Sequence, residues 1–126
     1  MNEDAPDLID TDTAALFRAI DARDGAAFAA FLTDDAVFRF GSAPPVEGRD
    51  AIRASVEAFF GSIAGLSHRV TTVVRDGATL FCEGEVTYER HDGSTISLPF
   101  ADVFDYEGDL IRHYKIYMDV TPLFAS

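Results

Sequence analysis

Asp102 and His113 have the residue types and the spacing for proton transfer, within the apolar stretch LPFADVFDYEGDLIRHYKIYMD of residues 98–119. The alternation of apolar and polar residues predicts two long antiparallel strands joined by a tight turn at Glu107-Gly108. A two-residue turn there would place Asp102 directly opposite His113, with Cβ atoms about 4.5–5.5 Å apart. A three-residue loop would instead place Tyr114 opposite Asp102.

A carboxylate beside an imidazole in an aromatic, desolvated setting is suited to acid–base chemistry. Imidazole exchanges protons near neutral pH, and an inward-facing acid on the wall of a cavity is costly without a purpose. We therefore predict Asp102 and His113 as the catalytic residues. The alternative is a buried carboxylate satisfied by backbone donors or by His113, with the histidine merely filling a hydrogen-bonding position.

Aromatic residues supply the wall of a predicted apolar pocket, since the chain holds 11 Phe and 4 Tyr. Such walls bind flat, ring-containing ligands and leave few polar groups to orient them. Arg39, Lys115 and Tyr117 are candidates to contact a polar ligand end, although solvated or salt-bridged roles are commoner for Arg39 and Lys115. A purely structural core role is the alternative for every aromatic candidate. The predicted substrate-binding residues are Phe17, Phe38, Phe40, Phe59, Phe60, Tyr88, Phe100 and Tyr117.

Other potentially reactive residues are interpreted as structural. His68 begins a predicted strand and His91 lies in a turn, so both are expected to be solvated. The single cysteine, Cys82, sits in a strand-like apolar run and is expected to be a small buried hydrophobe. No histidine joins the acidic pairs at a convincing spacing, and no phosphate cradle or nucleophile motif is present. We therefore predict neither a metal nor a cofactor.

Composition excludes several classes of function. The formal net charge is −12, whereas binding to nucleic acid or to an anionic membrane needs clustered Lys and Arg. No apolar run approaches the roughly 20 residues that span a bilayer. The N-terminal MNEDAPDLID lacks the basic start and small-residue cleavage site of a signal peptide. We expect a cytoplasmic protein with a small apolar ligand and no nucleic-acid or membrane partner.

The hydrophobic pattern predicts a single α+β domain over residues 12–126, after a flexible N-terminus at 1–11. Three helices are expected first: one around residues 16–20, one capped by Asp24, and one with an apolar stripe from Ile52 to Ile63. The alternation of apolar and polar residues has a period of two over residues 36–40 and again from His68 onward. This pattern predicts a short strand followed by a meander of long strands. The loop after Glu89 needs an odd length, or a bulge, for the apolar sides of consecutive strands to agree.

Four segments of the chain have an order and spacing that can be compared with known families. They are LTDDAVFRF, EGRDAIRASVEAFF, the D-x-F-x-x-x-G-x-L run from Asp102 to Leu110, and the closing YMDVTPLF. In order and spacing they resemble the nuclear-transport-factor-2-like superfamily, also called the SnoaL-like or ketosteroid-isomerase-like fold, over about residues 12–124. The resemblance implies a cone-shaped, curved antiparallel or mixed sheet wrapped around three N-terminal helices, with an apolar pocket. It also implies a homodimer, which members often form through the outer face of the sheet.

The resemblance carries over to a few individual residues. Asp102 falls where ketosteroid isomerases keep a protonated aspartate that donates to an oxyanion. The isomerase general base would fall at Phe40 and its oxyanion tyrosine near Leu16 or Phe17, so both groups are missing. The polar residues of limonene-epoxide-hydrolase-like members would fall at Phe38 and Phe40 and are missing too. What remains resembles the polyketide-cyclase-like members.

The sequence thus predicts a cofactor-independent acid–base enzyme of the isomerase, cyclase or dehydratase (lyase) type. Its substrate would be a small apolar ring-containing or conjugated carbonyl compound. Because one fold hosts many activities, the alternative is a non-catalytic small-molecule-binding or dimerisation module of the same fold. That alternative gains if Asp102 and His113 lie outside any cavity, and a protein adaptor ranks third.

Overall fold

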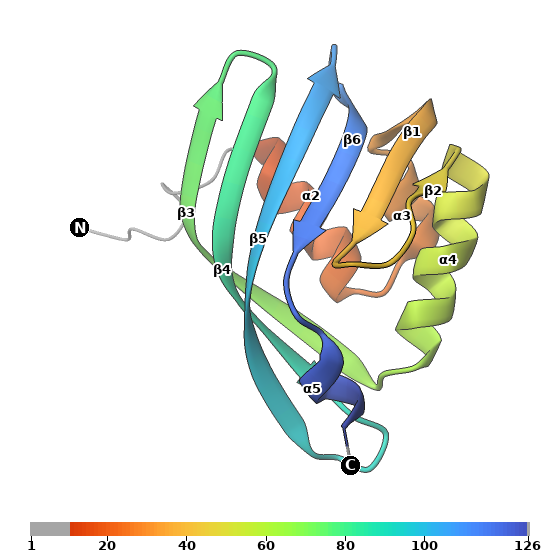
Figure 1. Cartoon of the computed structure of the whole chain (residues 1–126), viewed down its shortest axis with the longest axis vertical. Coiled ribbons are helices and arrows are strands. Elements are labelled where there is room, and N and C mark those ends of the chain that lie inside the picture. Colours follow the sequence, from red (N-terminus) through yellow and green to blue (C-terminus); the bar gives the residue numbers. More distant parts are fainter. Residues whose placement is uncertain (1–10, 126) are drawn as a thin grey trace.

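A curved sheet with helices on its concave side makes up the computed structural model, which describes residues 11–125 (Figure 1). Its elements are, in chain order, α2 (Thr11–Asp21), α3 (Gly25–Ala29), β1 (Leu32–Phe40), β2 (Val46–Glu47), α4 (Arg49–Gly61), β3 (Gly65–Asp76), β4 (Thr79–Glu89), β5 (Thr95–Glu107), β6 (Leu110–Tyr117) and α5 (Thr121–Phe124). The strand order is β2-β1-β6-β5-β4-β3, and all neighbours are antiparallel except β1 and β6. The predicted α+β architecture is confirmed. Of the flexible segment predicted at 1–11, all but Thr11 lies outside the described residues.

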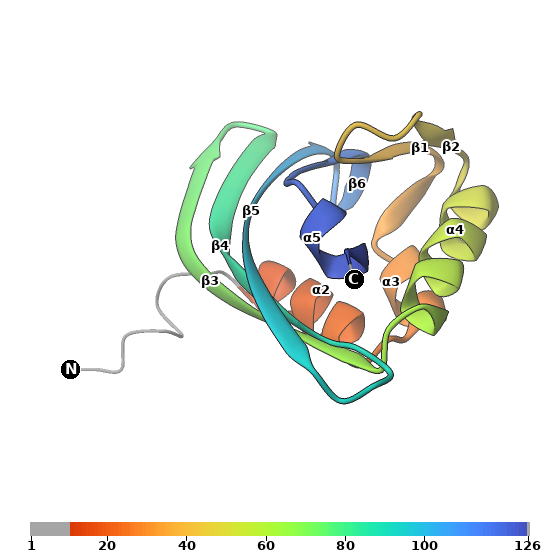
Figure 2. The same cartoon turned by 60° about the horizontal axis from the view of Figure 1, so that its bottom comes forward.

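The helices pack inside the curve of the sheet and along one of its edges (Figure 2). α2 crosses the concave side, and α4 runs beside β1 and β2. α3 begins after Asp24, whose side chain accepts a hydrogen bond from the backbone N–H of Ala27 at 3.0 Å, so the predicted cap is confirmed. α4 buries Ile52, Val56 and Phe60 at helical spacing. No helix among the described residues is long and apolar enough to cross a membrane.

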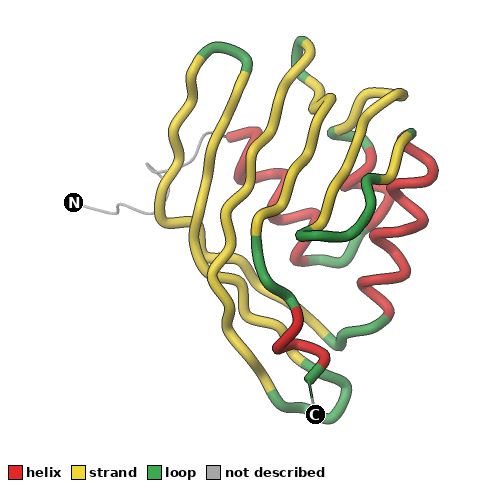
Figure 3. The backbone as a smooth tube through the Cα atoms, viewed as in Figure 1, coloured by secondary structure: helices red, strands yellow, loops and turns green. Residues whose placement is uncertain are grey.

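The long strands β3, β4 and β5 bend and twist along their length, which curves the open sheet (Figure 3). Pairing between β3 and β4 is irregular between Val70 and Thr72, and Gly84 of β4 is the partner of Val70. A methyl group at Gly84 would overlap the carbonyl oxygen of Arg69. Only glycine fits where two main chains approach this closely, and the irregularity increases the local twist.

The register between β4 and β5 follows the sequence-based expectation. Glu89 pairs with Thr95, so the connecting loop is residues 90–94, an odd number. Cys82 is consequently opposite Asp102. The apolar side of β4 therefore faces the same way as the apolar side of β5, because directly opposed residues share one face of a sheet.

The register between β5 and β6 differs from both predicted possibilities. The turn is Gly108-Asp109, one residue later than expected, and Gly108 adopts a φ of 63° that favours glycine. A bulge follows, because Tyr106 pairs with Ile111 while Asp105 pairs with His113. Relative to the predicted pairing with His113, the later turn shifts the residue opposite Asp102 by two positions along β6. The bulge shifts it by one more. Asp102 is therefore opposite Ile116, and the predicted pairing with His113, or with Tyr114, was wrong.

Candidate functional site

A cavity of about 120 Å³ lies between the concave face of the sheet and the helices. Its wall is mostly aromatic and aliphatic, and an apolar cavity of comparable size, about 150 Å³, is known to hold a benzene ring. Six of the predicted substrate-binding residues line it: Phe38, Phe40, Phe59, Phe60, Tyr88 and Phe100. Phe17 is buried behind this wall, with its ring centroid 5.9 Å from that of Phe100. Tyr117 lies outside the cavity and is 58 % exposed.

Asp102 projects from β5 into this cavity and is only 3 % exposed. Its neighbours across the sheet are Cys82 and Ile116, neither of which is a cation. Its Oδ1 atom has no hydrogen-bond partner among residues 11–125. Burial raises the pKa of the Asp102 carboxyl well above its usual range, because desolvation penalises the charged form. The site therefore favours a neutral carboxylic acid, which can donate a hydrogen bond to a ligand.

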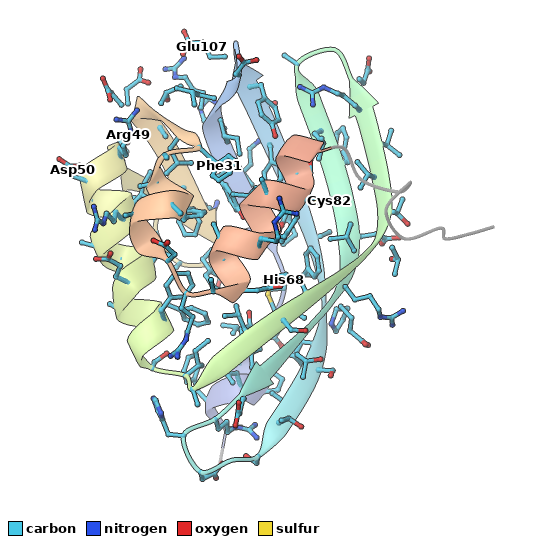
Figure 4. The ribbon with its side chains drawn as sticks, turned by 180° about the vertical axis from the view of Figure 1, so that it is seen from behind. Phe31, Arg49, Asp50, His68, Cys82 and Glu107 are labelled. Atoms are coloured by element: carbon cyan, nitrogen blue, oxygen red, sulfur yellow. The ribbon has the colours of Figure 1, made fainter. Side chains whose placement is uncertain are left out.

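His68 is another polar residue on the cavity wall, and it comes from β3. Its Nδ1 atom lies 2.6 Å from Oδ1 of Asp21, the last residue of α2. The other oxygen of Asp21 accepts a hydrogen bond from the backbone N–H of His68 at 3.0 Å. Figure 4 shows His68 between the helix and the strand. Both contacts fix the orientation of the ring.

The contact with Asp21 also engages Nδ1, which leaves Nε2 as the ring nitrogen available to a ligand. In the neutral ring, a proton on Nδ1 is held by the carboxylate, which leaves the lone pair on Nε2. Only 10 % of the His68 side chain is exposed, so little bulk water competes for that nitrogen. A histidine oriented in this way, on the wall of a cavity, can accept a proton.

Aromatic rings pack against His68 on the cavity wall. The His68 ring centroid lies 4.9 Å from that of Phe17 and 5.1 Å from that of Phe100, which meets it edge-on. Phe100 and Asp102 are two residues apart on β5 and so point to the same side, about 7 Å apart along the strand. The structure thus brings an oriented imidazole and a neutral carboxylic acid to one apolar cavity.

His113 does not join this site. It faces the opposite side of the sheet, where its Nδ1 atom is 3.7 Å from Oδ2 of Asp105, and 41 % of its side chain is exposed. It does not line the cavity. The physical reason is the register of β6, since the later turn and the bulge carry His113 away from Asp102 and turn it outward.

The sequence-based interpretation of His68 as solvated was wrong, and Asp21 was not singled out. A usable signal exists, because Leu66, His68 and Val70 alternate with polar residues and so share one face of a strand. That alternation places the imidazole on the apolar side. The partner Asp21 gives no comparable signal, since it is far away in sequence and only the packing of α2 on β3 brings it close.

The remaining titratable groups near Asp102 are held in their neutral forms. Cys82 is buried, as predicted, and burial together with the negative charge that Asp102 would carry raises the pKa of its thiol. The same two causes raise the pKa of Tyr88, whose hydroxyl donates to the sulfur of Met118 at 3.8 Å. They also raise the pKa of Tyr114. Among the described residues, no group of three or more His, Cys, Asp or Glu is placed to hold a metal ion.

Comparison with known protein families adds one decisive match. The sequence model of the SnoaL-like domain matches residues 13–114, which is most of the chain. The chain belongs to the SnoaL-like domain family. No curated protein matches this SnoaL-like chain.

Solved structures with the same fold are distant in sequence. A candidate polyketide cyclase from Xanthomonas campestris pv. campestris has a TM-score of 0.80 and 22 % identity, covering 89 % of this SnoaL-like chain and 90 % of its own. A candidate SnoaL-like polyketide cyclase from Jannaschia sp. CCS1 has a TM-score of 0.75 and 17 % identity, with 89 % and 88 % covered. An LEH-like epoxide hydrolase from M. tuberculosis has a TM-score of 0.76 and 19 % identity, with 90 % and 84 % covered. These similarities show a shared fold.

Proposed function

We propose that this SnoaL-like domain is a cofactor-independent acid–base enzyme acting on a small, apolar, ring-containing or conjugated carbonyl compound. The reaction would be an isomerisation, a cyclisation or a dehydration. One observation carries the proposal: His68, which Asp21 orients, and the buried acid Asp102 line the same apolar cavity.

The two groups have complementary tasks in the proposed reaction. Nε2 of His68 removes a proton from the carbon next to the substrate carbonyl, and the electron pair moves onto the carbonyl oxygen. Asp102, kept neutral by burial, donates a hydrogen bond to that oxygen and stabilises the enolate. Asp21 stabilises the resulting imidazolium through Nδ1. In an isomerisation the proton then returns to another carbon, and in a dehydration it leaves with a departing hydroxide as water. In a cyclisation the enolate carbon forms a bond to a second carbonyl carbon of the substrate, and the oxygen of that carbonyl takes the proton.

The shape of the cavity supports the substrate class. Aromatic side chains on several elements offer flat surfaces to a ring, and few polar groups are available to orient it. The volume of about 120 Å³ suits a portion of a ligand about the size of one ring. Two of the structural neighbours described as candidate polyketide cyclases, and one described as an epoxide hydrolase, are consistent with an enzyme of this fold.

A non-catalytic small-molecule-binding module is the second candidate. Phe38 and Phe40 favour it, because they occupy positions where the resemblance to catalytic members calls for polar groups. In that case the same cavity would bind an apolar ligand without turning it over.

Hydrogen exchange separates the two candidates without knowledge of the substrate. Cyclic ketone probes, 1-tetralone and 2-cyclohexenone, would be incubated with the protein in D₂O, and deuterium uptake next to the carbonyl measured by NMR. We expect uptake to exceed the buffer rate, and to fall about 10²–10⁴-fold in His68→Gln or Asp102→Asn. His113→Gln serves as the matched control and should leave uptake unchanged. Ketones that bind without any accelerated exchange would support the binding module instead.

We also propose that the chain is a homodimer in the cytoplasm, paired through the outer face of the sheet. On that face Val74 and Phe81 are direct cross-strand partners and are 55 % and 46 % exposed. Val103 continues the apolar row on β5. A pair of exposed apolar side chains on a sheet face gains by burial against a second copy. Phe81→Lys should convert the dimer to a monomer in sedimentation experiments, whereas a monomeric unsubstituted protein would contradict the proposal.

A further inference from the structure

A groove of about 350 Å³ lies at the end of β1 and β6, beside the loop that follows β1. It is lined by Arg39, Gly41, Ser42, Lys115 and Tyr117, together with parts of Ile116 and Met118. Two cationic side chains thus share one depression on a chain whose formal net charge is −12.

The two cations are direct neighbours, because Arg39 and Lys115 are partners in the parallel pairing of β1 with β6. Like charges side by side on a sheet repel each other, and an acidic neighbour would relieve the repulsion. Neither residue forms an ion pair with any other residue in the described range 11–125. Other exposed arginines do: Arg69 lies 3.6 Å from Glu85, and Arg112 lies 3.5 Å from Asp35.

Arg39 is also held in position. Its Nε atom donates to the carbonyl oxygen of Ala43 at 3.2 Å, which anchors the guanidinium against the loop. The two terminal nitrogens remain available, and this end of a guanidinium matches the two oxygens of a carboxylate. Lys115 adds a second positive charge beside it.

The groove adjoins the cavity that holds Asp102. Ile116 and Met118 line both spaces. The loop after β1 also serves both, because Gly41 and Ser42 line the groove while Ala43 and Pro44 line the cavity. Arg39 and Lys115 face the outer side of the sheet, whereas the cavity lies on the inner side. A ligand whose ring occupies the cavity would therefore reach the groove with a short chain that passes around this loop, at the end of β1 and β6.

We propose that the substrate carries a carboxylate on a short tether, which binds between Arg39 and Lys115 while the ring occupies the cavity. This inference rests on the proposed function, because it assigns the second end of the same substrate. An anionic substrate would be repelled by the acidic chain as a whole, and a local pair of cations in the groove offsets that repulsion. The tether also fixes which end of the molecule enters the cavity.

Phenylalkanoates from phenylacetate to phenylhexanoate test this assignment against their methyl esters. Dissociation constants would be measured by calorimetry at low and at high salt. At one tether length we expect the acid to bind about 3- to 10-fold more tightly than its ester, as two partly exposed charge contacts allow, and the preference to shrink at high salt. The double variant Arg39→Gln with Lys115→Gln should lose the preference and keep ester affinity. Arg69→Gln, an exposed arginine on the same sheet, is the matched control and should keep the preference.

The outcomes separate the two proposals. Esters that bind as well as acids at every tether length overturn the carboxylate site and leave the cavity as the ligand site. A preference for acids that survives in the double variant also overturns it. A double variant that changes the sedimentation coefficient instead of acid binding assigns the two cations to an interface between copies. If neither acids nor esters bind, but hexanoate without a ring binds through Arg39 and Lys115, the anion site stands and the cavity fails. Absence of any binding overturns both.

Discussion

Two neighbouring rows of residues cross the same five strands and face opposite sides of the sheet. The inner row consists of Val73, Cys82, Asp102, Ile116 and Phe40. The outer row consists of Val74, Phe81, Val103, Lys115 and Arg39. Each residue of one row is adjacent in the chain to a residue of the other, yet the acid of the inner row is 3 % exposed while Phe81 of the outer row is 46 % exposed.

The contrast shows that solvent access decides what a charged residue type can do. On the inner side burial makes the charged form of Asp102 unfavourable, so the residue becomes a neutral hydrogen-bond donor. On the outer side Lys115 and Arg39 line a groove that is open to water. A shift of one position in register exchanges these roles, and the β6 bulge fixes which residues receive which.

The largest effect is expected when the inner acid is removed. Asp102→Asn keeps the shape but replaces the carboxylic acid by an amide, a weaker hydrogen-bond donor to the enolate oxygen, so deuterium uptake by the ketone probe should fall about 10²–10⁴-fold. Asp105→Asn, an acid three positions along β5 on the outer side, is the control and should change uptake less than twofold. Equal losses in both variants would mean that the two faces are not functionally distinct.

The second-largest effect is expected in the free energy of unfolding, because the inner face of the sheet is packed in the core and the outer face is not. Phe104 is fully buried, with its ring centroid 4.5 Å from that of Tyr114, so Phe104→Ala should reduce the free energy of unfolding by about 3–5 kcal/mol. Phe81→Ala on the outer side removes the same group from a half-exposed site and should cost about 1 kcal/mol or less in the monomer. Urea titrations of both variants measure the difference. Similar midpoints would contradict the burial contrast.

The pH dependence of stability gives a third test of the contrast between the two faces. Burial raises the pKa of Asp102, so the folded protein binds this proton more tightly than the unfolded chain does. The stabilising contribution is complete below about pH 3.9, the usual value for an unfolded aspartate, and is lost as pH rises through the folded pKa. Relative to the unsubstituted protein, Asp102→Asn should gain about 1.4 kcal/mol per pH unit across that window.

Urea unfolding at a series of pH values from 4 to 8, with Asp105→Asn alongside, measures this gain. The outer variant should follow the pH curve of the unsubstituted protein. Parallel curves for the unsubstituted protein and Asp102→Asn would refute a buried, neutral acid.

The smallest effect is expected at His113. It lies 3.7 Å from Asp105 in a partly exposed pair, and such pairs contribute about 0–1 kcal/mol. His113→Gln should therefore change the free energy of unfolding by less than about 1 kcal/mol and deuterium uptake by less than twofold. A large loss of uptake would return His113 to the catalytic site despite its outward position.

The order of helices and strands was predictable because each element carries its own local pattern, such as the helical stripe of Ile52, Val56 and Phe60. The odd loop after Glu89 was predictable for a similar reason, since both flanking strands have one apolar side. The candidate acid Asp102 and most of the aromatic wall could also be named from the sequence.

The partner of Asp102 could not be predicted, because the register of β6 depends both on where the turn at Gly108-Asp109 falls and on a bulge that leaves no local signature around Arg112. A slip of this kind changes no composition and little propensity, but it redirects every later side chain. The contact between His68 and Asp21 joins residues on α2 and β3 that are 47 positions apart, so only tertiary packing creates it. Local patterns therefore located the cavity wall better than the pair of groups that would act inside it.

Gly84 has a consequence for how this fold can diversify. Its close approach to the carbonyl of Arg69 is a contact between two main chains, and no cavity-lining side chain takes part in it. The curvature that encloses the cavity is thus specified separately from the residues that line it. Lineages can exchange wall residues, and with them substrates and reactions, while inheriting an unchanged enclosure.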